Sequence, residues 1–375
     1  MRIALTGGLV ADGNGTAPVP GTVLVEDDRI AGVLPPAASL PPGAEVIDAT
    51  GNIVAPGFID LHSHADFSLG SAPAAESQLA QGVTTLVAGN CGWSPFPITN
   101  LEILRAGTAF LGARHEWSWH DLAGFAATLE PAVNLALQVG HCTLRIAVMG
   151  SAQRAPSADE LRQMQDLLRA AADQGAVGFS TGLIYAPGTY AEPSEVAALV
   201  ATAGECGLLY STHLRNEGAG LLAALDEAIA AARAGGARLE VSHLKAVGTT
   251  NHGLVSAALE HLDRADVDLG WDAYPYTATS TTLTTRLPAW ALAGGTLLDR
   301  LADPAERERI ADALRSDQLL SPDTVVIASL PPGRYEDSRG LTLTRSPVPT
   351  AWTPLRSCCA SSNTTRRPSA SSTTR

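Results

Sequence analysis

Five side chains of the kinds that bind transition metals fall at or just beyond the ends of short apolar runs. His62 and His64 lie in GFIDLHSH, and Cys91, His213 and His243 each follow or end another such run. Runs of this length and composition are typical of β-strands. Thiolate and imidazole ligands that several strand ends deliver to one rim are typical of a catalytic metal site on a barrel of parallel strands. The sequence therefore predicts a metal site built from these five residues.

Each of these assignments has a plainer alternative. Two histidines two residues apart on a strand point to the same face, here the barrel interior, but a histidine at a strand end can also be structural. Cys91 lies between Asn90 and Gly92, and a lone cysteine in such a turn would be a buried free thiol. The coincidence of the cysteine with four histidines on matching strand ends favours ligands. Asp66 is either an acceptor that orients a ligand or a solvated loop acid.

Other polar residues are weaker candidates. Most remaining histidines lie in helices or loops with polar neighbours, where surface roles are expected: His115, His120, His252 and His261. His141 ends a strand and could support a ligand. Four more side chains lie just past strand ends and project toward the same rim: Tyr185, Arg215, Lys245 and Tyr276. Cations and phenols there suit a substrate that carries a carboxylate, although ordinary solvated loop residues are the alternative.

The elements that position these residues follow two patterns. Residues 1–55 alternate short β-like runs with turns, which predicts a small β meander. From residue 56 onward strands alternate with helices, which is typical of a parallel sheet. Seven strands are expected at about 54–61, 83–89, 134–140, 176–181, 208–213, 238–243 and 267–273. The run Thr324–Ser329 ends in no candidate ligand, and we place it in a helical insertion at about 288–340 rather than in an eighth strand.

Composition narrows the class of protein. A net charge of −13 over 375 residues argues against nucleic acid or an anionic membrane as a partner. No run approaches the roughly 18 to 20 apolar residues of a membrane span, so a cytoplasmic protein is expected. The chain beyond Gly340 changes character: Ser, Thr, Arg and Pro make up 24 of its last 35 residues, 341–375. This composition predicts a disordered tail, and the abrupt change suggests an altered reading frame.

With these residues assembled, the chain resembles the amidohydrolase superfamily and, within it, the D-aminoacylases (N-acyl-D-amino-acid deacylases). The resemblance covers about residues 1–340. It rests on six motifs in order: GFIDLHSHAD (57–66), GNCGWSP (89–95), STGLIYAPGTYA (180–191), STHLRNEG (211–218), VSHLK (241–245) and DAYPY (272–276). The Asn-Cys-Gly element is the most specific, because most amidohydrolases bridge their metals with a modified lysine. The resemblance implies a (β/α)8 TIM-type barrel with a small β-domain.

The resemblance also implies roles for single residues. Cys91, His213 and His243 would hold one tight zinc ion, and His62 and His64 would share Cys91 in a second, weaker metal position. Contacts to a small N-acyl amino acid substrate are implied for four residues, with Lys245 on the α-carboxylate: Tyr185, Lys245, Tyr276 and Ser280. The implied reaction is hydrolysis of the substrate amide to a carboxylate and a free D-amino acid.

The chain departs from this pattern near its end. The last acidic residue is Asp337, so the catalytic Asp that the resemblance places near position 360, after an eighth strand, is missing. The expectation is an incomplete barrel without its eighth strand, a partial β-domain at residues 1–55, and impaired hydrolysis. Two alternatives stay open: a cyclic-amide hydrolase of the dihydropyrimidinase type, with Lys245 between the metals, and a non-catalytic zinc-binding remnant.

Overall fold

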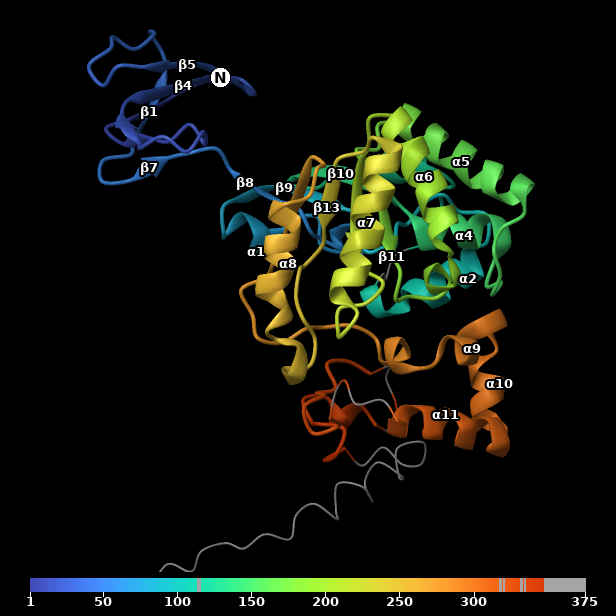
Figure 1. Ribbon diagram of the computed structural model, residues 1–375. Coiled ribbons are helices and arrows are strands. Elements are labelled where there is room, and N and C mark those ends of the chain that lie inside the picture. The colour runs from blue at the N-terminus through green and yellow to red at the C-terminus, as the bar shows by residue number, and fades with distance from the viewer. Residues whose placement is uncertain (113–115, 317–318, 320, 331–332, 334, 347–375) are drawn as a thin grey trace, which may run out of the picture. The chain divides into compact units, whose positions relative to one another are not determined.

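The computed structural model describes residues 1–112, 116–316, 319, 321–330, 333 and 335–346 (Figure 1). The chain divides into two compact units. The first comprises residues 1–60 and 76–85, and the second comprises residues 61–75 and those from 86 onward. The larger part of the predicted tail, residues 347–375, lies outside the described residues, as does His115. In the described part of the chain, no helix is long and apolar enough to cross a membrane.

The first unit is built from short strands. β1 is the centre of a four-stranded sheet of order β5-β4-β1-β6, where it pairs antiparallel with β4 and parallel with β6. A three-stranded sheet of order β3-β2-β7 completes the meander. The strands are β1 Arg2–Thr6, β2 Leu9–Val10, β3 Val19–Pro20, β4 Thr22–Glu26, β5 Arg29–Leu34, β6 Glu45–Asp48 and β7 Ile53–Val54. The short helix α1 (Glu76–Leu79) also belongs to this unit.

The alternating part of the chain forms a seven-stranded sheet of order β14-β13-β12-β11-β10-β9-β8, and neighbouring strands from β10 to β14 pair in parallel. Consecutive strands are neighbours, as expected when a helix returns the chain to the same end of the sheet each time. The strands are β8 Phe58–Asp60, β9 Val83–Ala88, β10 Asn134–Gly140, β11 Gly178–Gly182, β12 Leu209–His213, β13 Leu239–Val241 and β14 Leu269–Trp271. All seven predicted strands are confirmed.

Helices cover this sheet and bury an apolar core. The helices of the second unit are α2 Leu101–Thr108, α3 Leu122–Ala126, α4 His141–Met149, α5 Ala158–Asp173, α6 Pro193–Glu205, α7 Leu221–Gly235, α8 Leu254–Asp263, α9 Ala289–Leu292, α10 Leu297–Ala302 and α11 Pro304–Ser316. Figure 1 follows the alternation of strand and helix through this unit. Fully buried side chains such as Leu168, Leu199 and Leu225 come from α5, α6 and α7, and each stabilises the fold by about 1.5–3 kcal/mol.

Local sequence signals fix the ends of these helices. Ser157 Oγ accepts the backbone N–H of Glu160, and the Glu160 carboxylate accepts the backbone N–H of Ser157, so a capping box precedes α5. Three glycines have positive φ angles where helices give way to strands: 100° at Gly175, 69° at Gly207 and 65° at Gly236. These joints lie at the edge of the sheet where the strands begin. The candidate ligands lie at the opposite edge, where the parallel strands end.

The described residues after β14 form no further strand of this sheet. Helices α9 to α11 occupy the predicted insertion, and Val326 forms only an isolated antiparallel bridge with Thr342. Ile327 N–H donates to the carbonyl of Leu341 at 3.0 Å, and Leu343 N–H donates to the carbonyl of Val325 at 3.0 Å. Residues 340–343 therefore pair with the segment 325–327.

Candidate metal centre

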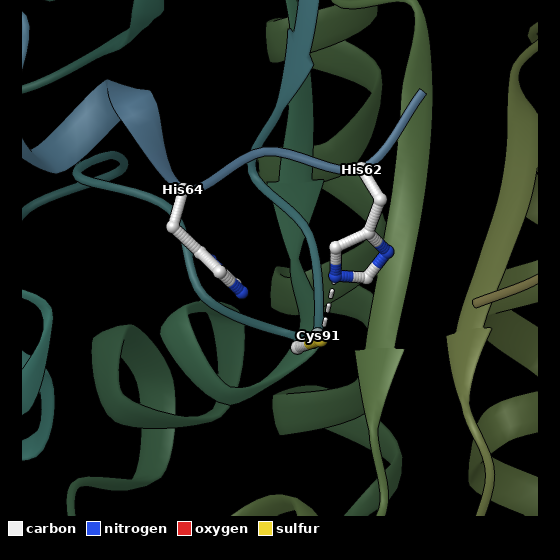
Figure 2. Close-up of side chains that lie close together, drawn as sticks. All are labelled: His62, His64 and Cys91. Atoms are coloured by element: carbon white, nitrogen blue, oxygen red, sulfur yellow. Dashed lines mark hydrogen bonds between the residues drawn. The ribbon is translucent and has the colours of Figure 1, made fainter. Parts of the chain in front are cut away.

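The five predicted ligands come together in two overlapping groups. His62, His64 and Cys91 form one group, and Cys91, His213 and His243 form the other. Within each group the ligand atoms all lie within 4.8 Å of one another, and Cys91 belongs to both. Figure 2 shows how His62 and His64, from the segment after β8, approach the thiol that follows β9. Strand ends thus deliver all five side chains to one place.

The distances fit a transition metal bound by sulfur and nitrogen. Cys91 Sγ lies 3.4 Å from His62 Nε2 and 3.3 Å from His243 Nε2. A tetrahedral zinc ion with Zn–S of about 2.3 Å and Zn–N of about 2.0–2.1 Å holds such atoms roughly 3.6 Å apart. Nδ1 of His213 and Nδ1 of His64 are buried without a hydrogen-bond partner, and His213 Nε2 lies 3.5 Å from Glu217 Oε2, as expected of side chains that need a further partner.

The backbone around Cys91 has a special shape. Cys91 has a φ of 55° and His243 a φ of 40°, and they are two of the four non-glycine residues with positive φ in the described part of the chain. Such left-handed residues cost about 1–3 kcal/mol each and occur mainly at functional sites. A side chain at Gly182 would meet the Cys91 carbonyl oxygen at 1.9 Å, so only glycine allows β11 to pack against this turn.

A chain of amides holds the two ligand segments together. Asn90 Nδ2 donates to the carbonyl of Val87 at 2.9 Å and lies 3.3 Å from the carbonyl of Ser63. Asn90 Oδ1 accepts from Gln138 Nε2 at 2.9 Å, and Gln138 Oε1 accepts from Ser211 Oγ at 2.8 Å. This buried network connects the His62–His64 segment to the Cys91 turn and to strands β10 and β12. It fixes the ligands before any ion is bound.

The electrostatics of the site favour the metal-binding forms of Cys91 and His213. Burial would raise the pKa of the Cys91 thiol, but the neighbouring imidazoles of His62 and His243 outweigh burial and hold that pKa well below its usual range. Burial lowers the pKa of His213, which keeps that imidazole neutral. Burial would also lower the pKa of His62 and of His243, but the Cys91 thiolate and the neighbouring carboxylates outweigh it, so the pKa of His62 is raised to about 10 and that of His243 is raised, and both must lose a proton when a metal binds. A thiolate and a neutral imidazole are the species that ligate transition metals. The site is therefore poised for a cation.

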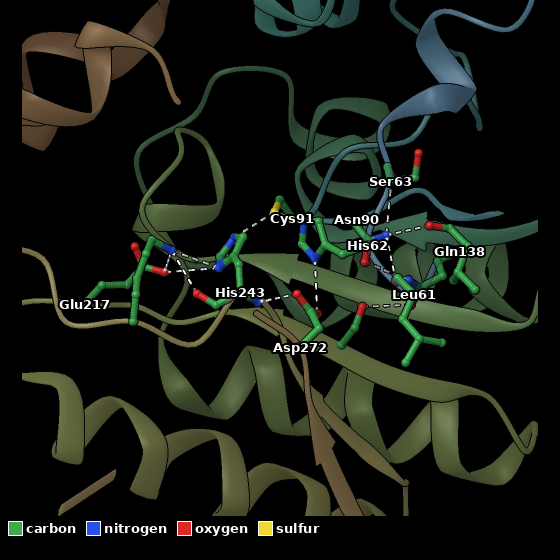
Figure 3. A network of polar contacts seen from close by, with 12 residues as sticks. Leu61, His62, Ser63, Asn90, Cys91, Gln138, Glu217, His243 and Asp272 are labelled. Atoms are coloured by element: carbon green, nitrogen blue, oxygen red, sulfur yellow. Dashed lines mark hydrogen bonds and ion pairs between the residues drawn. The ribbon is translucent and has the colours of Figure 1, made fainter. Parts of the chain in front are cut away.

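Two carboxylates lie behind the ligands, and reasoning from the sequence assigned neither a role. Glu217 Oε1 lies 3.3 Å from His243 Nδ1, and Asp272 Oδ2 lies 3.4 Å from His62 Nδ1 (Figure 3). Burial opposes ionisation of Glu217, but the surrounding imidazoles and the Lys245 ammonium outweigh it and lower its pKa to about 2. Both acids stand within motifs quoted above, one after β12 and the other directly after β14. Their position just past a strand end was the available signal.

The residues predicted to contact substrate fall into two sets. Tyr185 is buried with its ring centroid 5.1 Å from that of His213, and its hydroxyl lies 3.1 Å from Thr281 Oγ1. Lys245 Nζ donates to Glu217 Oε1 at 2.6 Å, so it too lies beside the ligands. Tyr276 and Ser280 are exposed, and their substrate contacts stay predictions.

Several weaker candidates are placed elsewhere by the structure. Arg215 forms a two-pronged ion pair with Glu227, with both N–O distances 2.8 Å, rather than standing open at the rim. His141 lies in a separate buried network, where Nε2 is 2.8 Å from Glu195 Oε1. Asp66 lies within the short 3-10 turn Ala65–Phe67 and is fully buried, so its interpretation as a solvated loop acid is wrong.

Comparisons with known proteins agree with this arrangement. The pattern of the amidohydrolase family matches residues 45–281. The chain is 40% identical over 289 residues to an N-acyl-D-glutamate deacylase of Alcaligenes xylosoxydans xylosoxydans, which covers 76% of this chain and 58% of that protein. It is 37% identical over 291 residues to a D-aminoacylase of the same organism, which covers 75% of this chain and 58% of that protein. The chain thus spans somewhat more than half the length of these relatives.

Solved structures give the same result. An N-acyl-D-glutamate deacylase from Bordetella bronchiseptica, crystallised with zinc and a phosphonate inhibitor, superposes with a TM-score of 0.69 at 40% identity, covering 73% of this chain and 58% of that one. A crystal structure of a D-aminoacylase superposes with a TM-score of 0.66 at 36% identity, covering 74% and 59%. The matched residues 45–281 include all five candidate ligands. The chain therefore belongs to the amidohydrolase family.

Proposed function

We propose that the chain is a zinc-dependent deacylase that hydrolyses the amide bond of N-acyl-D-amino acids. The observation that carries the proposal is the shared position of Cys91 in two groups of ligands, one completed by His213 and His243 and the other by His62 and His64. The similarity to N-acyl-D-glutamate deacylase and D-aminoacylase supports the substrate class. When bound, zinc supplies Lewis acidity that polarises the amide carbonyl and activates water.

The residues of the chain supply binding and orientation. Lys245 offers a cation beside the centre for the substrate α-carboxylate, and Tyr185 offers a hydroxyl close to His213. Tyr276 and Ser280 complete the proposed substrate contacts. The buried, apolar surroundings of Cys91 and Tyr185 keep bulk water from competing for these contacts. Together these groups would fix the amide near the two ligand groups.

We expect this chain to hydrolyse its substrates slowly. The sheet is proposed to be an incomplete (β/α)8 barrel without its eighth strand, with residues 1–55 as part of a small β-domain. The sequence has no acidic residue after Asp337 to accept a proton from water and return it to the leaving amine. That role is worth roughly 10²–10⁴-fold in rate. Cyclic-amide hydrolysis with Lys245 between the metals is less supported, because Lys245 is bound to Glu217 and Cys91 already belongs to both groups.

Hydrolysis of a panel of N-acetyl-D-amino acids, with their L-forms as controls, tests the proposal directly. We expect release of free D-amino acid by the purified chain with bound zinc, at a rate that falls when zinc is removed by a chelator and returns when it is added back. Zinc-loaded chain that hydrolyses no member of the panel would contradict the proposed activity.

Replacing Lys245 by methionine is expected to lower kcat/KM for N-acyl-D-amino acids about 10- to 150-fold, mainly through KM. The substitution keeps the length of the side chain and removes one charged hydrogen bond, worth about 1.5–3 kcal/mol. The measurement is the initial rate over a range of substrate concentrations. As a control, Arg264→Met removes an exposed cation paired with Glu260 and should leave both constants unchanged. An unchanged KM in the Lys245 variant would remove the lysine from the substrate site.

A further inference from the structure

Each ligand group contains one histidine whose two ring nitrogens face different partners. His243 points Nε2 toward Cys91 Sγ at 3.3 Å and Nδ1 toward Glu217 at 3.3 Å. His62 points Nε2 toward the same sulfur at 3.4 Å and Nδ1 toward Asp272 at 3.4 Å. Figure 3 shows Glu217 beside His243, and Asp272 between His243 and His62. The arrangement repeats once per ligand group.

A carboxylate behind a histidine determines which nitrogen can bind a metal. A neutral imidazole carries one N–H, and a carboxylate accepts but never donates when it is ionised. Placed at Nδ1, it keeps the proton there and leaves the lone pair on Nε2, which is the atom that faces Cys91. Partners of this kind fix the tautomer and the ring orientation of metal-binding histidines.

We propose that Glu217 and Asp272 are positioning residues that act on different metal positions. Glu217 orients His243 in the group that contains Cys91 and His213, and Asp272 orients His62 in the group that contains Cys91 and His64. The inference rests on the zinc site of the proposed function but not on catalysis. It goes further, because it assigns one carboxylate to each position.

Glu217 has a second task, because a competing donor lies beside His243. Lys245 Nζ is 3.0 Å from His243 Nδ1 and 2.6 Å from Glu217 Oε1. An ammonium group can only donate, so a bond from Lys245 to Nδ1 would place the imidazole proton on Nε2, toward Cys91. That tautomer cannot ligate through Nε2. Glu217 Oε1 accepts from Lys245 at the shorter distance and lies 3.3 Å from Nδ1, so it competes with Nδ1 for the lysine N–H and offers Nδ1 an acceptor.

Burial and anchoring make these contacts definite. The side chains of Glu217 and Asp272 are only 10% and 17% exposed. Asp272 Oδ1 accepts the backbone N–H of His243 at 2.8 Å, which fixes the carboxylate so that Oδ2 faces His62. An asparagine at position 272 would keep that anchor while presenting an amide N–H to His62 Nδ1. The substitution therefore reverses the hydrogen bond and leaves the backbone contact in place.

Zinc titration of the metal-free chain, in competition with a chromophoric chelator, tests the division. We expect two zinc constants in the wild-type chain. Glu217→Ala should weaken the tighter one about 10- to 100-fold, Glu217→Gln should weaken it less, and Asp272→Asn should weaken only the second. Asp226→Asn is the matched control, since it alters a surface carboxylate–histidine pair with His261, and it should change neither constant.

A second signal locates the effect, because Lys245 is the only lysine in the sequence. Protein labelled with 13C at the lysine ε-carbon gives one side-chain NMR signal in a folded sample. Glu217→Ala should shift this signal in the metal-free chain, and Asp272→Asn should leave it in place. If the circular dichroism spectrum shows that Glu217→Ala does not fold, Glu217→Gln is used instead, because glutamine keeps the volume of the side chain and an oxygen acceptor.

Three outcomes overturn the inference: a single zinc constant in the wild-type chain, variants that lower both constants equally, or variants that change neither. None of these readouts involves hydrolysis. The expected zinc pattern in a chain that cleaves no N-acyl-D-amino acid would refute the proposed function and leave the inference standing. If the wild-type chain hydrolyses N-acyl-D-amino acids but the variants leave both zinc constants unchanged, the inference is refuted and the proposed function stands.

Discussion

Replacing Cys91 by alanine is expected to abolish stoichiometric zinc binding and to lower the rate of any hydrolysis by about 10³-fold or more. Cys91 is the only residue common to both ligand groups in the described part of the chain, so its loss removes a ligand from each. Without the ion, the amide loses the Lewis acid that is worth several kcal/mol of transition-state stabilisation. Metal analysis of the purified variant, with rates on the same sample, makes the measurement.

Cys206→Ala is the matched control for this variant. Cys206 lies at the end of α6, is half-buried and belongs to neither ligand group. It should retain zinc and rate. Retention of one zinc per chain by Cys91→Ala would refute the role of this cysteine as a ligand, whatever the activity of the protein.

Glu195→Ala is expected to destabilise the fold by about 3–5 kcal/mol. Glu195 lies in a fully buried network with two partners, the guanidinium of Arg145 and the imidazole of His141, which is 2.8 Å away. Removing the carboxylate leaves a buried guanidinium without its counter-ion, which is among the most costly single changes in a protein interior. The free energy of unfolding in urea measures the effect.

Glu192→Ala provides the comparison, since Glu192 is exposed at the start of the same helix and its side chain makes no capping bond. Its effect should stay within about 0.5 kcal/mol. Equal stability of the Glu195 and Glu192 variants would show that the buried network contributes little.

The same network predicts how stability depends on pH. Burial would raise the pKa of Glu195, but His141 and Arg145 outweigh it, and the pKa of this carboxyl is lowered. A lowered pKa contributes stability that is present above the pKa of the unfolded chain and is lost as pH falls through the folded value. Wild-type chain should therefore lose more stability than Glu195→Ala as the pH is lowered below about 4. Parallel curves of urea midpoint against pH would contradict this.

The strands and ligands could be predicted from the sequence because their signals are local. Apolar runs mark β9 to β14, glycine joints precede β11, β12 and β13, and each ligand stands at or just past the end of an apolar run. Neighbouring parallel strands bring their ends to one edge of the sheet. Residues at the ends of successive strands could therefore be expected to lie close together. For this reason His213 and His243, thirty residues apart, could be placed together.

The supporting residues could not be predicted in this way. Glu217 and Asp272 are acids in loops just past strand ends, and this position alone does not distinguish them from solvated acids. Glu217 gains its role from Lys245, which lies 28 residues further along. The partner of Arg215 could not be predicted for the same reason, because Glu227 lies on α7 and only the folded helix brings it close. Side-chain pairing between segments depends on packing that local patterns do not encode.

The spacing of the ligands along the chain has a consequence for folding order. The Cys91–His243 contact joins residues 152 apart, so closing this loop costs conformational entropy that the intervening elements must first offset. Strands β9 to β13 have to pair before the thiol meets the imidazole, and contacts of this sequence separation form slowly. Bound zinc is accordingly a late marker of folding: its stoichiometry counts the molecules whose sheet has come together.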